Sequence, residues 1–406
     1  MKPVAMSSAA DTVAALRRLQ GFMLEWRGRP PIIITHLSLT DFRNYSSLEL
    51  SLPRGGVVLV GSNAQGKSNL LEAAYLLSIM RSHRAGVERE LIRLGAEGER
   101  PWARVVGRAQ GEAGGAEIEV VLQRTAGEAV SKRIKVNGVP RRAGEAVGVL
   151  AGVMFSADDI GLVSGPPALR RRYLDITSCQ LSAQHLGSLQ RYQRVLVQRN
   201  GLLKMAAQGR AGTDEMEFWD REMVAEGGYI REHRQALVQA LNGLAHQIHT
   251  GLTHGEEALQ MDYRPNPLDP SPEAFAKALA EGRGRDMALG MTLSGPHRDD
   301  LRFMVNGMDI GIYGSRGQQR TVALSLRLAE AAFLHEGRGQ PPVLLLDDVL
   351  SELDGHRRHQ LLASLAPYDQ WLLTTTDSSQ VDSPYLEEST VRHIKGGTVG
   401  QPPGGL

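Results

Sequence analysis

The apolar positions of this chain follow two periodicities, one typical of strands and one typical of helices. Short apolar or alternating runs of the strand type occur at 32–39, 48–52, 56–60, 117–122, 133–136, 343–346 and 371–377. Apolar residues at helical spacing occur at 69–77, 181–203, 216–244 and 321–334. Because strand-like runs lie on both sides of the two long helical stretches, we expect an α/β core that is interrupted by an inserted helical lobe.

These patterns divide the 406 residues into five segments. They are an N-terminal extension (1–30), the first half of the core (31–175), the helical lobe (176–288), the second half of the core (289–395) and a disordered tail (396–406). The extension is either a flexible tail or a stretch that precedes the true start codon. Asn137-Gly138 is a strong hairpin signal and predicts a small antiparallel β subdomain within 102–150. The run 371–377 is the last predicted strand.

A phosphate-binding loop is the most specific signal in the chain. Residues 61–68 read G-S-N-A-Q-G-K-S directly after the apolar run 56–60 and directly before a helical pattern. In such a loop the backbone N–H groups and the N-terminus of the next helix face phosphate oxygens, Lys67 reaches the β- and γ-phosphates, and Ser68 holds Mg²⁺. The predicted nucleotide-binding residues here are Gly61, Ser62, Asn63, Ala64, Gln65, Gly66, Lys67, Ser68 and Asn69. The alternative is a glycine-rich turn with a chance lysine.

Five stretches in order resemble the RecF recombination-mediator family, which belongs to the ABC-type ATPase heads of chromosome-maintenance proteins. They are F-R-N-Y with the phosphate loop (42–68), P-A-L-R-R-R-Y-L-D (167–175), L-S-G-P-H-R-D-D-L (293–301), S-R-G-Q (315–318) and L-L-L-D-D (344–348). The resemblance covers about residues 32–395. It implies an ABC-type head with a mixed sheet, ATP and Mg²⁺ as cofactors, and weak DNA-dependent ATP hydrolysis.

The resemblance also implies roles for residues outside the phosphate loop. Arg43 and Asn44 would lie near the nucleotide, although a solvated turn explains them equally well. Ser315, Gly317 and Gln318 would form the signature that such heads deliver in trans to the γ-phosphate of a nucleotide held by a second subunit. Taken alone, Ser315 is a simple helix N-cap.

Two carboxylates end the strand at 343–346. Asp347 would orient the Mg²⁺ shell. Asp348 stands where many ABC-type heads have the glutamate that polarises the attacking water, so it is the predicted base, and Lys67 and Ser315 complete the predicted catalytic set. Because aspartate is shorter than glutamate, we expect slow hydrolysis.

Departures from the general ABC pattern narrow the class of protein. Ser156 stands where related heads have a metal-binding glutamine, and Asp158 or Asp159 could compensate. The chain lacks both the L-S-G-G-Q signature and the switch histidine of a transporter's motor subunit. The insertion of roughly 110 residues at 176–288 excludes the long coiled-coil arms of a chromosome-condensation head.

Three basic segments are candidate DNA contacts, because Lys and Arg bind phosphodiester groups. They supply Arg84, then Lys132, Arg133 and Lys135, and then Arg191, Arg194 and Arg199. Arg84 aligns with the arginine loop of the related heads, and 176–213 contains no acidic residue. The alternatives are a solvated helix face and an ordinary exposed hairpin. His297 has no assigned role, and Arg298 could contact a phosphate.

Composition excludes several other classes. A formal net charge of +1 argues against a purely electrostatic coat on nucleic acid, the single cysteine excludes an internal disulfide, and no apolar run reaches the length of a membrane span. The resemblance implies a homodimer in the ATP state, binding to gapped DNA or single-strand/double-strand junctions, and RecR and RecO as partners. It further implies work in repair, replication restart and the SOS response to DNA damage, in the cytoplasm and on the nucleoid.

Overall fold

The computed structural model describes residues 33–96, 98, 100–111, 114–125, 129–210 and 214–400. The predicted extension, 1–30, lies outside these residues. Contacts between residues divide the chain into two compact units. Of the described residues, we call 33–159 with 327–400 the phosphate-loop unit and 160–326 the helical unit.

The helical unit is larger than the predicted helical lobe of 176–288, because sequence on either side of the lobe packs within it. Arg170 Nε donates to Asp300 Oδ1 over 2.7 Å, and Tyr173 Oη donates to the backbone oxygen of Leu326 over 2.9 Å. These bonds tie chain that precedes the lobe to chain that follows it. The predicted boundaries are therefore corrected outward.

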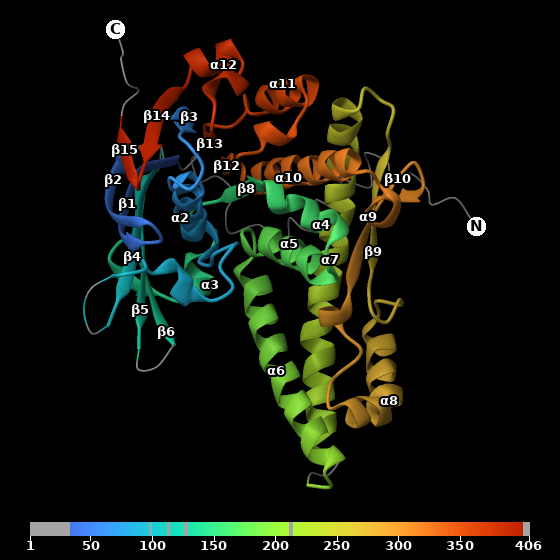
Figure 1. The fold of residues 1–406 in the computed structure, drawn as a ribbon. Coiled ribbons are helices and arrows are strands. Elements are labelled where there is room, and N and C mark those ends of the chain that lie inside the picture. The colour runs from blue at the N-terminus through green and yellow to red at the C-terminus, as the bar shows by residue number, and fades with distance from the viewer. Residues whose placement is uncertain are drawn as a thin grey trace. The chain divides into compact units, whose positions relative to one another are not determined.

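A six-stranded antiparallel sheet forms one layer of the phosphate-loop unit (Figure 1). In spatial order its strands are β2 (Tyr45–Ser51), β1 (Ile33–Phe42), β4 (Trp102–Gly111), β5 (Gly114–Arg124), β6 (Val130–Val136) and β7 (Val139–Arg141). β1 pairs with β4, with Leu39 opposite Val105. The predicted β subdomain is thus continuous with the N-terminal hairpin, and its Asn137-Gly138 turn joins β6 to β7 as predicted.

A second, mixed sheet carries the phosphate loop, as expected of the predicted α/β core. In spatial order its strands are β15 (Thr398–Gly400), β14 (Thr390–Lys395), β3 (Gly55–Val60), β13 (Gln370–Thr375), β12 (Val343–Asp347) and β8 (Gly152–Ser156). All neighbours are parallel except β14 and β15. The central strands are buried on both faces and mostly apolar, as expected of parallel strands inside a core.

Two predictions about the C-terminal region were wrong. β13 is not the last strand, because β14 and β15 follow it. The tail predicted as disordered, 396–406, forms a turn and strand β15 up to residue 400, and 401–406 lie outside the described residues. The three residues of β15 are too few to carry a periodic signal, and pairing with β14 orders them.

Helix α2 (Lys67–Ile79) contacts strands of both sheets and is buried around most of its circumference (Figure 1). The unit also contains α3 (Ala143–Ala146), α11 (Gly355–Ser364) and α12 (Ser383–Glu387). Helix α10 (Arg316–Arg338) begins in the helical unit and ends in the phosphate-loop unit.

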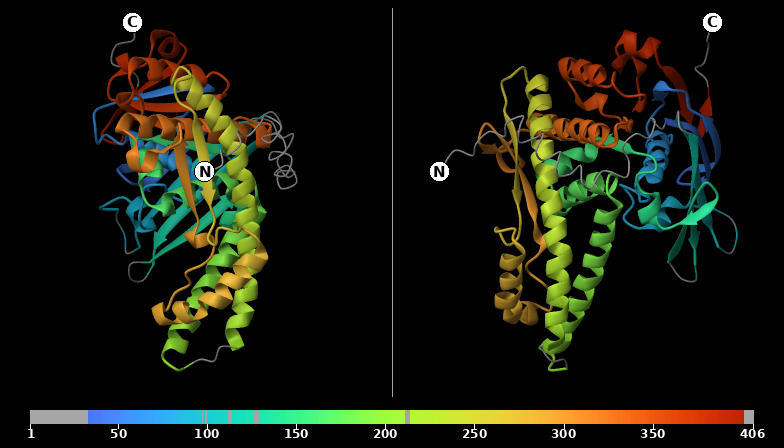
Figure 2. Two further views of the ribbon diagram at one scale, coloured as in Figure 1. Left: turned by 90° about the vertical axis from the view of Figure 1, so that its right-hand side faces the viewer. Right: turned by 180° about the vertical axis from the view of Figure 1, so that it is seen from behind.

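The helical unit is built around two antiparallel helices, α6 (Ala183–Ala207) and α7 (Asp214–Leu252), which lie side by side in both views of Figure 2. Its other elements are α4 (Ile160–Ser164), α5 (Pro167–Cys179), α8 (Pro272–Leu289), α9 (Ile310–Tyr313) and a sheet of β11 (Met308–Asp309), β10 (Asp300–Val305) and β9 (Leu259–Arg264). Tyr192 and Leu196 of α6 pack with Met223 of α7 and Phe275 of α8 in its core. Within the described part of the chain, no helix is both long and apolar enough to span a bilayer.

Candidate functional site

The phosphate loop joins β3 to α2, and the turn between β1 and β2 packs against it. Gly66 has φ 113°, and a Cβ there would lie 2.6 Å from Asn44 Nδ2, so the position accepts only glycine. Asn44 Nδ2 donates to the backbone oxygen of Gln65 over 3.1 Å, and Tyr45 Oη donates to that of Gly66 over 3.0 Å. The F-R-N-Y stretch therefore supports the loop directly.

Lys67 lies inside the loop at the first position of α2. Its Nζ donates to the backbone oxygens of Gly61 over 2.5 Å and Ser62 over 2.9 Å. Burial lowers the pKa of Lys67, and the carboxylates of Asp348 and Asp347 oppose that shift. A phosphate group would offer this ammonium a charged partner in place of two neutral carbonyls.

Asp347 and Ser68 are 279 residues apart in the chain and meet at the end of strand β12. Ser68 Oγ donates to Asp347 Oδ1 over 2.8 Å, and Thr374 Oγ1 donates to the same oxygen over 2.9 Å. Thr374 lies opposite Asp347 in the parallel register of β12 and β13. A serine hydroxyl and a carboxylate are oxygen ligands of the kind that Mg²⁺ prefers, so this pair fits the ion.

Asp348, next along the chain, has the features of a reactive carboxylate. Its φ is 52°, a conformation that is strained for a non-glycine residue. Its N–H donates to Thr374 Oγ1 over 2.9 Å, and its buried Oδ1 has no hydrogen-bond partner among the described residues. Burial raises the pKa of Asp348, Asp347 reinforces the shift and Lys67 opposes it.

Arg43 and Asn44, both predicted to lie near the nucleotide, have different roles. The carboxylate of Glu72 is fully buried and accepts two hydrogen bonds from the Arg43 guanidinium, from Nε and from Nη2, each over 2.8 Å. Ser82 Oγ also donates to Glu72. Asn44 contacts the loop itself. Both residues, together with Asn69, line a pocket of about 620 Å³ beside the loop. Both lie in the turn between β1 and β2, where Asn44 is exposed and Arg43 is partly buried.

The sequence did not single out Tyr45, Glu72 or Thr374. Tyr45 falls within the F-R-N-Y stretch, so its position next to Arg43 and Asn44 was the only available signal. Thr374 could have been found by aligning β12 and β13 as parallel neighbours. Glu72 is one of the helical residues after the loop, where nothing in the local pattern distinguishes a buried acid from an exposed one.

Ser315 lies in the helical unit and caps helix α10. Gln318 N–H donates to Ser315 Oγ over 3.2 Å, Ser315 N–H donates to Gln318 Oε1 over 3.1 Å, and Gln318 Nε2 donates to Glu257 over 2.8 Å. These are the bonds of the N-cap alternative. Ser315 and Gly317 are nevertheless exposed at a helix N-terminus, where anions are favoured.

Asp159, one of the two aspartates predicted to compensate for the missing glutamine, is already bonded to other residues. It accepts hydrogen bonds from the backbone N–H of Ser156 over 2.8 Å and from Arg327 Nη2 over 2.7 Å. Asp158 is exposed. The proposed compensation by Asp158 or Asp159 therefore stays a prediction, and for Asp159 it would require a carboxylate that already neutralises Arg327.

Arg199 was wrongly predicted as a DNA contact. Its side chain is fully buried and is held by Asp220 and Asp286, each at 2.7 Å, and by Thr292 at 2.8 Å. Arg191 is half exposed and paired with Glu226, and Arg194 is exposed. The absence of acids from 176–213 misled the prediction because the acids come from α7 and α8.

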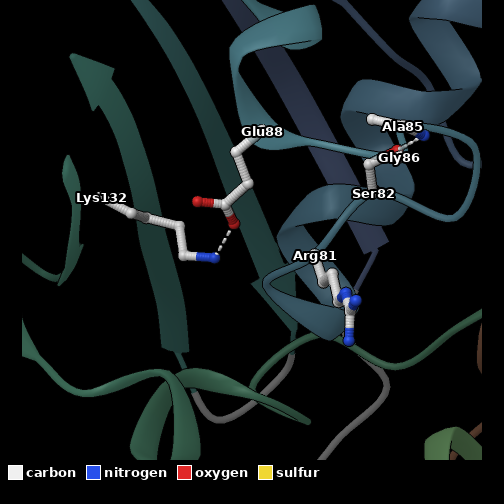
Figure 3. A pocket seen from close by; sticks show the side chains of 6 residues that line it. All are labelled: Arg81, Ser82, Ala85, Gly86, Glu88 and Lys132. Atoms are coloured by element: carbon white, nitrogen blue, oxygen red, sulfur yellow. Dashed lines mark hydrogen bonds and ion pairs between the residues drawn. The ribbon is translucent and has the colours of Figure 1, made fainter. Parts of the chain in front are cut away.

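Two of the three predicted hairpin cations, Lys132 and Lys135, are paired with acids from other elements. Figure 3 shows Lys132 donating to Glu88 across a pocket of about 320 Å³ that Arg81 also lines. Lys135 Nζ lies 3.1 Å from Glu119 of β5. Arg133 and Arg84 remain exposed, and Arg133 Nη2 is 3.3 Å from Gln123 Oε1.

The chain is similar to known proteins over almost its whole length. The family model described as the RecF/RecN/SMC N terminal domain matches residues 33–393. The DNA replication and repair protein RecF of Herpetosiphon aurantiacus is 42% identical over 384 residues, which are 90% of this chain and 99% of the relative. RecF of Halalkalibacterium halodurans is 39% identical over 375 residues, with 90% and 98% covered.

Solved structures of RecF and of Smc heads have the same fold as this chain. The recombination mediator protein RecF-ATP in the RecFOR pathway superimposes with a TM-score of 0.83 at 30% identity, covering 93% of this chain and 99% of that one. An Smc head domain from Pyrococcus furiosus shares the fold, with a TM-score of 0.51 at 16% identity over 91% of this chain and 95% of that one. Fold and phosphate loop thus define an ABC-type ATPase head of the RecF/RecN/SMC class. Within that class, the chain belongs to the RecF family of DNA replication and repair proteins.

Proposed function

We propose that this protein is an ATP-dependent, DNA-binding recombination mediator. The observation that supports it most is the hydrogen bond of 2.8 Å between Ser68 Oγ and Asp347 Oδ1, which unites the phosphate loop with the second phosphate-site strand. Lys67 and residues 61–66 would hold the phosphates of ATP, and Ser68 with Asp347 would hold Mg²⁺. Bound Mg²⁺ would neutralise charge on the phosphate oxygens. Asp348 would act as the base for a slow hydrolysis.

ATP would join two copies of the chain. In this proposal Ser315, Gly317 and Gln318 of one copy contact the nucleotide of the other. Ile312 and Tyr313, directly before Ser315, are 67% and 71% exposed. Large apolar side chains beside an exposed anion-binding helix end are what a second protein surface would cover. Hydrolysis would then release the dimer.

The DNA-binding part of the proposal rests on family membership and on the basic residues that remain at the surface. Relatives of this chain are DNA replication and repair proteins, and one solved relative is a mediator of the RecFOR pathway. We infer binding to gapped DNA or single-strand/double-strand junctions, and work with RecO and RecR to load recombinase. Such work would place the protein in the cytoplasm, on the nucleoid.

Three variants separate the steps of this proposal. Lys67→Met should abolish nucleotide binding and dimer formation. Ser315→Ala should keep binding but weaken ATP-dependent dimers, and Asp348→Asn should keep both and slow hydrolysis at least tenfold. Calorimetry with ATP and Mg²⁺, sedimentation and phosphate release measure the three properties in parallel.

The outcome for Ser315→Ala decides the trans assignment. Unchanged ATP-dependent dimers in sedimentation would refute it, whereas loss of binding to the monomer would place Ser315 in the same subunit's site. If wild-type protein stays monomeric with a non-hydrolysable analogue and Mg²⁺, ATP-dependent dimerisation is wrong.

A further inference from the structure

The turn between β14 and β15 contacts the phosphate loop from the far end of the chain. Gly396 N–H donates to the side-chain oxygen of Gln65 over 2.7 Å, and Gly397 N–H donates to the backbone oxygen of Gln65 over 3.1 Å. β14 brings the turn there because it runs parallel to β3, with His393 opposite Val60. The loop is therefore held by residues about 330 positions later in the sequence.

Glycine is required at one of the two turn positions for space. Gly397 has φ 77°, and a Cβ there would lie 2.8 Å from the backbone oxygen of Asn44. Gly396 has a similar φ of 56°, but a Cβ there would meet no atom within 4 Å. The turn thus packs closely against Asn44 through Gly397 alone.

The first residue of the loop, Gly61, packs closely against strand β14. A Cβ on Gly61 would lie 2.4 Å from the backbone oxygen of Ile394 in β14. The loop's first glycine therefore abuts strand β14, and its last turn, at Gln65, is bonded to the residues that follow the strand. Both ends of the loop depend on the same C-terminal hairpin.

The bonds to Gln65 set the direction of one N–H group. Its backbone oxygen accepts from Asn44 Nδ2 and from Gly397 N–H, each over 3.1 Å. A peptide unit is planar and trans, so fixing this carbonyl holds the N–H of Gly66 in the opposite direction. Backbone N–H groups of such loops are the donors to phosphate oxygens.

We propose that the turn Gly396-Gly397 is a positioning element, which preorganises the phosphate loop for its nucleotide. This inference rests on the proposed nucleotide binding for the identity of the ligand. Without the turn, the peptide after Gln65 would sample other orientations, and only the fraction of molecules with the productive one would bind. The expected result of disturbing it is weaker nucleotide binding without a matching loss of stability.

Gly397→Ala and Gly396→Ala form a matched pair for this test. Both place alanine at positive φ and so carry a similar backbone penalty, but only the methyl group at 397 meets Asn44. We expect Gly397→Ala to raise the Kd for ATP with Mg²⁺ on the order of tenfold, and Gly396→Ala to raise it less than about threefold. The thermal midpoints of the two nucleotide-free variants should fall by similar amounts.

Hydrogen exchange without nucleotide gives an independent readout. Amides of residues 61–68 should exchange faster in Gly397→Ala than in Gly396→Ala. If Gly397→Ala does not fold, Gln65→Ala, which removes the acceptor of the Gly396 N–H, should show the same faster exchange. Equal Kd values and equal exchange in the matched pair would overturn the proposal. If wild-type protein binds no ATP, the proposed function fails, and the exchange experiment still decides whether the turn orders the loop.

Discussion

Lys67 in the phosphate-loop unit and Arg199 in the helical unit are both buried cations, but their partners come from very different distances along the chain. Lys67 bonds to carbonyls five and six residues away, inside its own motif. Arg199 bonds to carboxylates 21 and 87 residues away, on two other helices. A short motif contains enough of its own surroundings to be interpreted from sequence. A basic helix does not, because its neutralising acids are elsewhere.

The largest expected effect tests the buried network around Arg199. Arg199→Ala would remove the cation that holds the buried Asp286 and would leave Asp220 paired with Arg283 alone, and breaking a buried pair in this way costs about 3–5 kcal/mol. Arg194→Ala, on the exposed face of the same helix, should change the free energy of unfolding by less than about 0.5 kcal/mol. Urea unfolding measures the free energy of unfolding of both variants, and hydrogen exchange in α6 and α7 locates the loss. Similar stabilities for the two variants would mean that Arg199 is not part of a structural network.

The same contrast explains what could be predicted from the sequence. The strand before the loop, Lys67, Ser68 and Asp347 follow from local patterns, and the structure brings them together. The boundary at 160 and the pairing of β1 with β4 depend on contacts between distant segments. The sequence offered Asp158 or Asp159 as a substitute for the glutamine without revealing that Asp159 pairs with Arg327, 168 residues away. Local sequence predicted elements and motifs, but not which charges neutralise one another.

A second difference between the units lies in the buried groups that can titrate, and it predicts different responses to acid. His233 of α7 is buried and stacked on His185, with ring centroids 4.5 Å apart. Burial, reinforced by the nearby His185, lowers the pKa of His233 to about 3, and burial lowers the pKa of His185 as well. In the phosphate-loop unit, the buried Glu72 has a lowered pKa through its bonds to Arg43 and Ser82, which outweigh its desolvation.

The sign of the histidine effect follows from these pKa values. A folded-state pKa below the unfolded value of about 6.5 means that the unfolded chain binds the proton more readily, so stability is fully present above pH 6.5 and declines as the pH falls toward 3. At pH 5 His233 alone should cost the helical unit about 2 kcal/mol. Glu72 should matter only below about pH 4.5.

We therefore expect the helical unit to open first between pH 7 and pH 5. Hydrogen exchange at both pH values should accelerate in α6 and α7 while α2 stays protected. His233→Phe keeps the ring and removes the titration, so it should flatten the pH dependence of the helical unit. An equal response of both units to mild acid would contradict this assignment.

The smallest expected effect concerns which unit contacts DNA, and it compares two acids that each neutralise a candidate cation. Glu88 pairs with Lys132 in the phosphate-loop unit, and Glu226 pairs with Arg191 in the helical unit. Lys132 shares its pocket with Arg81, so a DNA phosphate there could meet two cations once Glu88 is neutral (Figure 3). At the other site Arg191 donates to Glu226 and to Ser188.

Glu88→Gln should therefore raise affinity for gapped DNA by roughly threefold, in keeping with the small energy of a partly exposed ion pair. It should also steepen the plot of log K against log salt by at most about one unit, because one more phosphate is neutralised. Glu226→Gln adds the same charge at the other site and controls for net charge. Gel shifts across a salt series, with ATP and Mg²⁺ present, measure both. A larger gain for Glu226→Gln would move the DNA contact to the helical unit, and Arg191 with Arg194 would then be the cations to mutate.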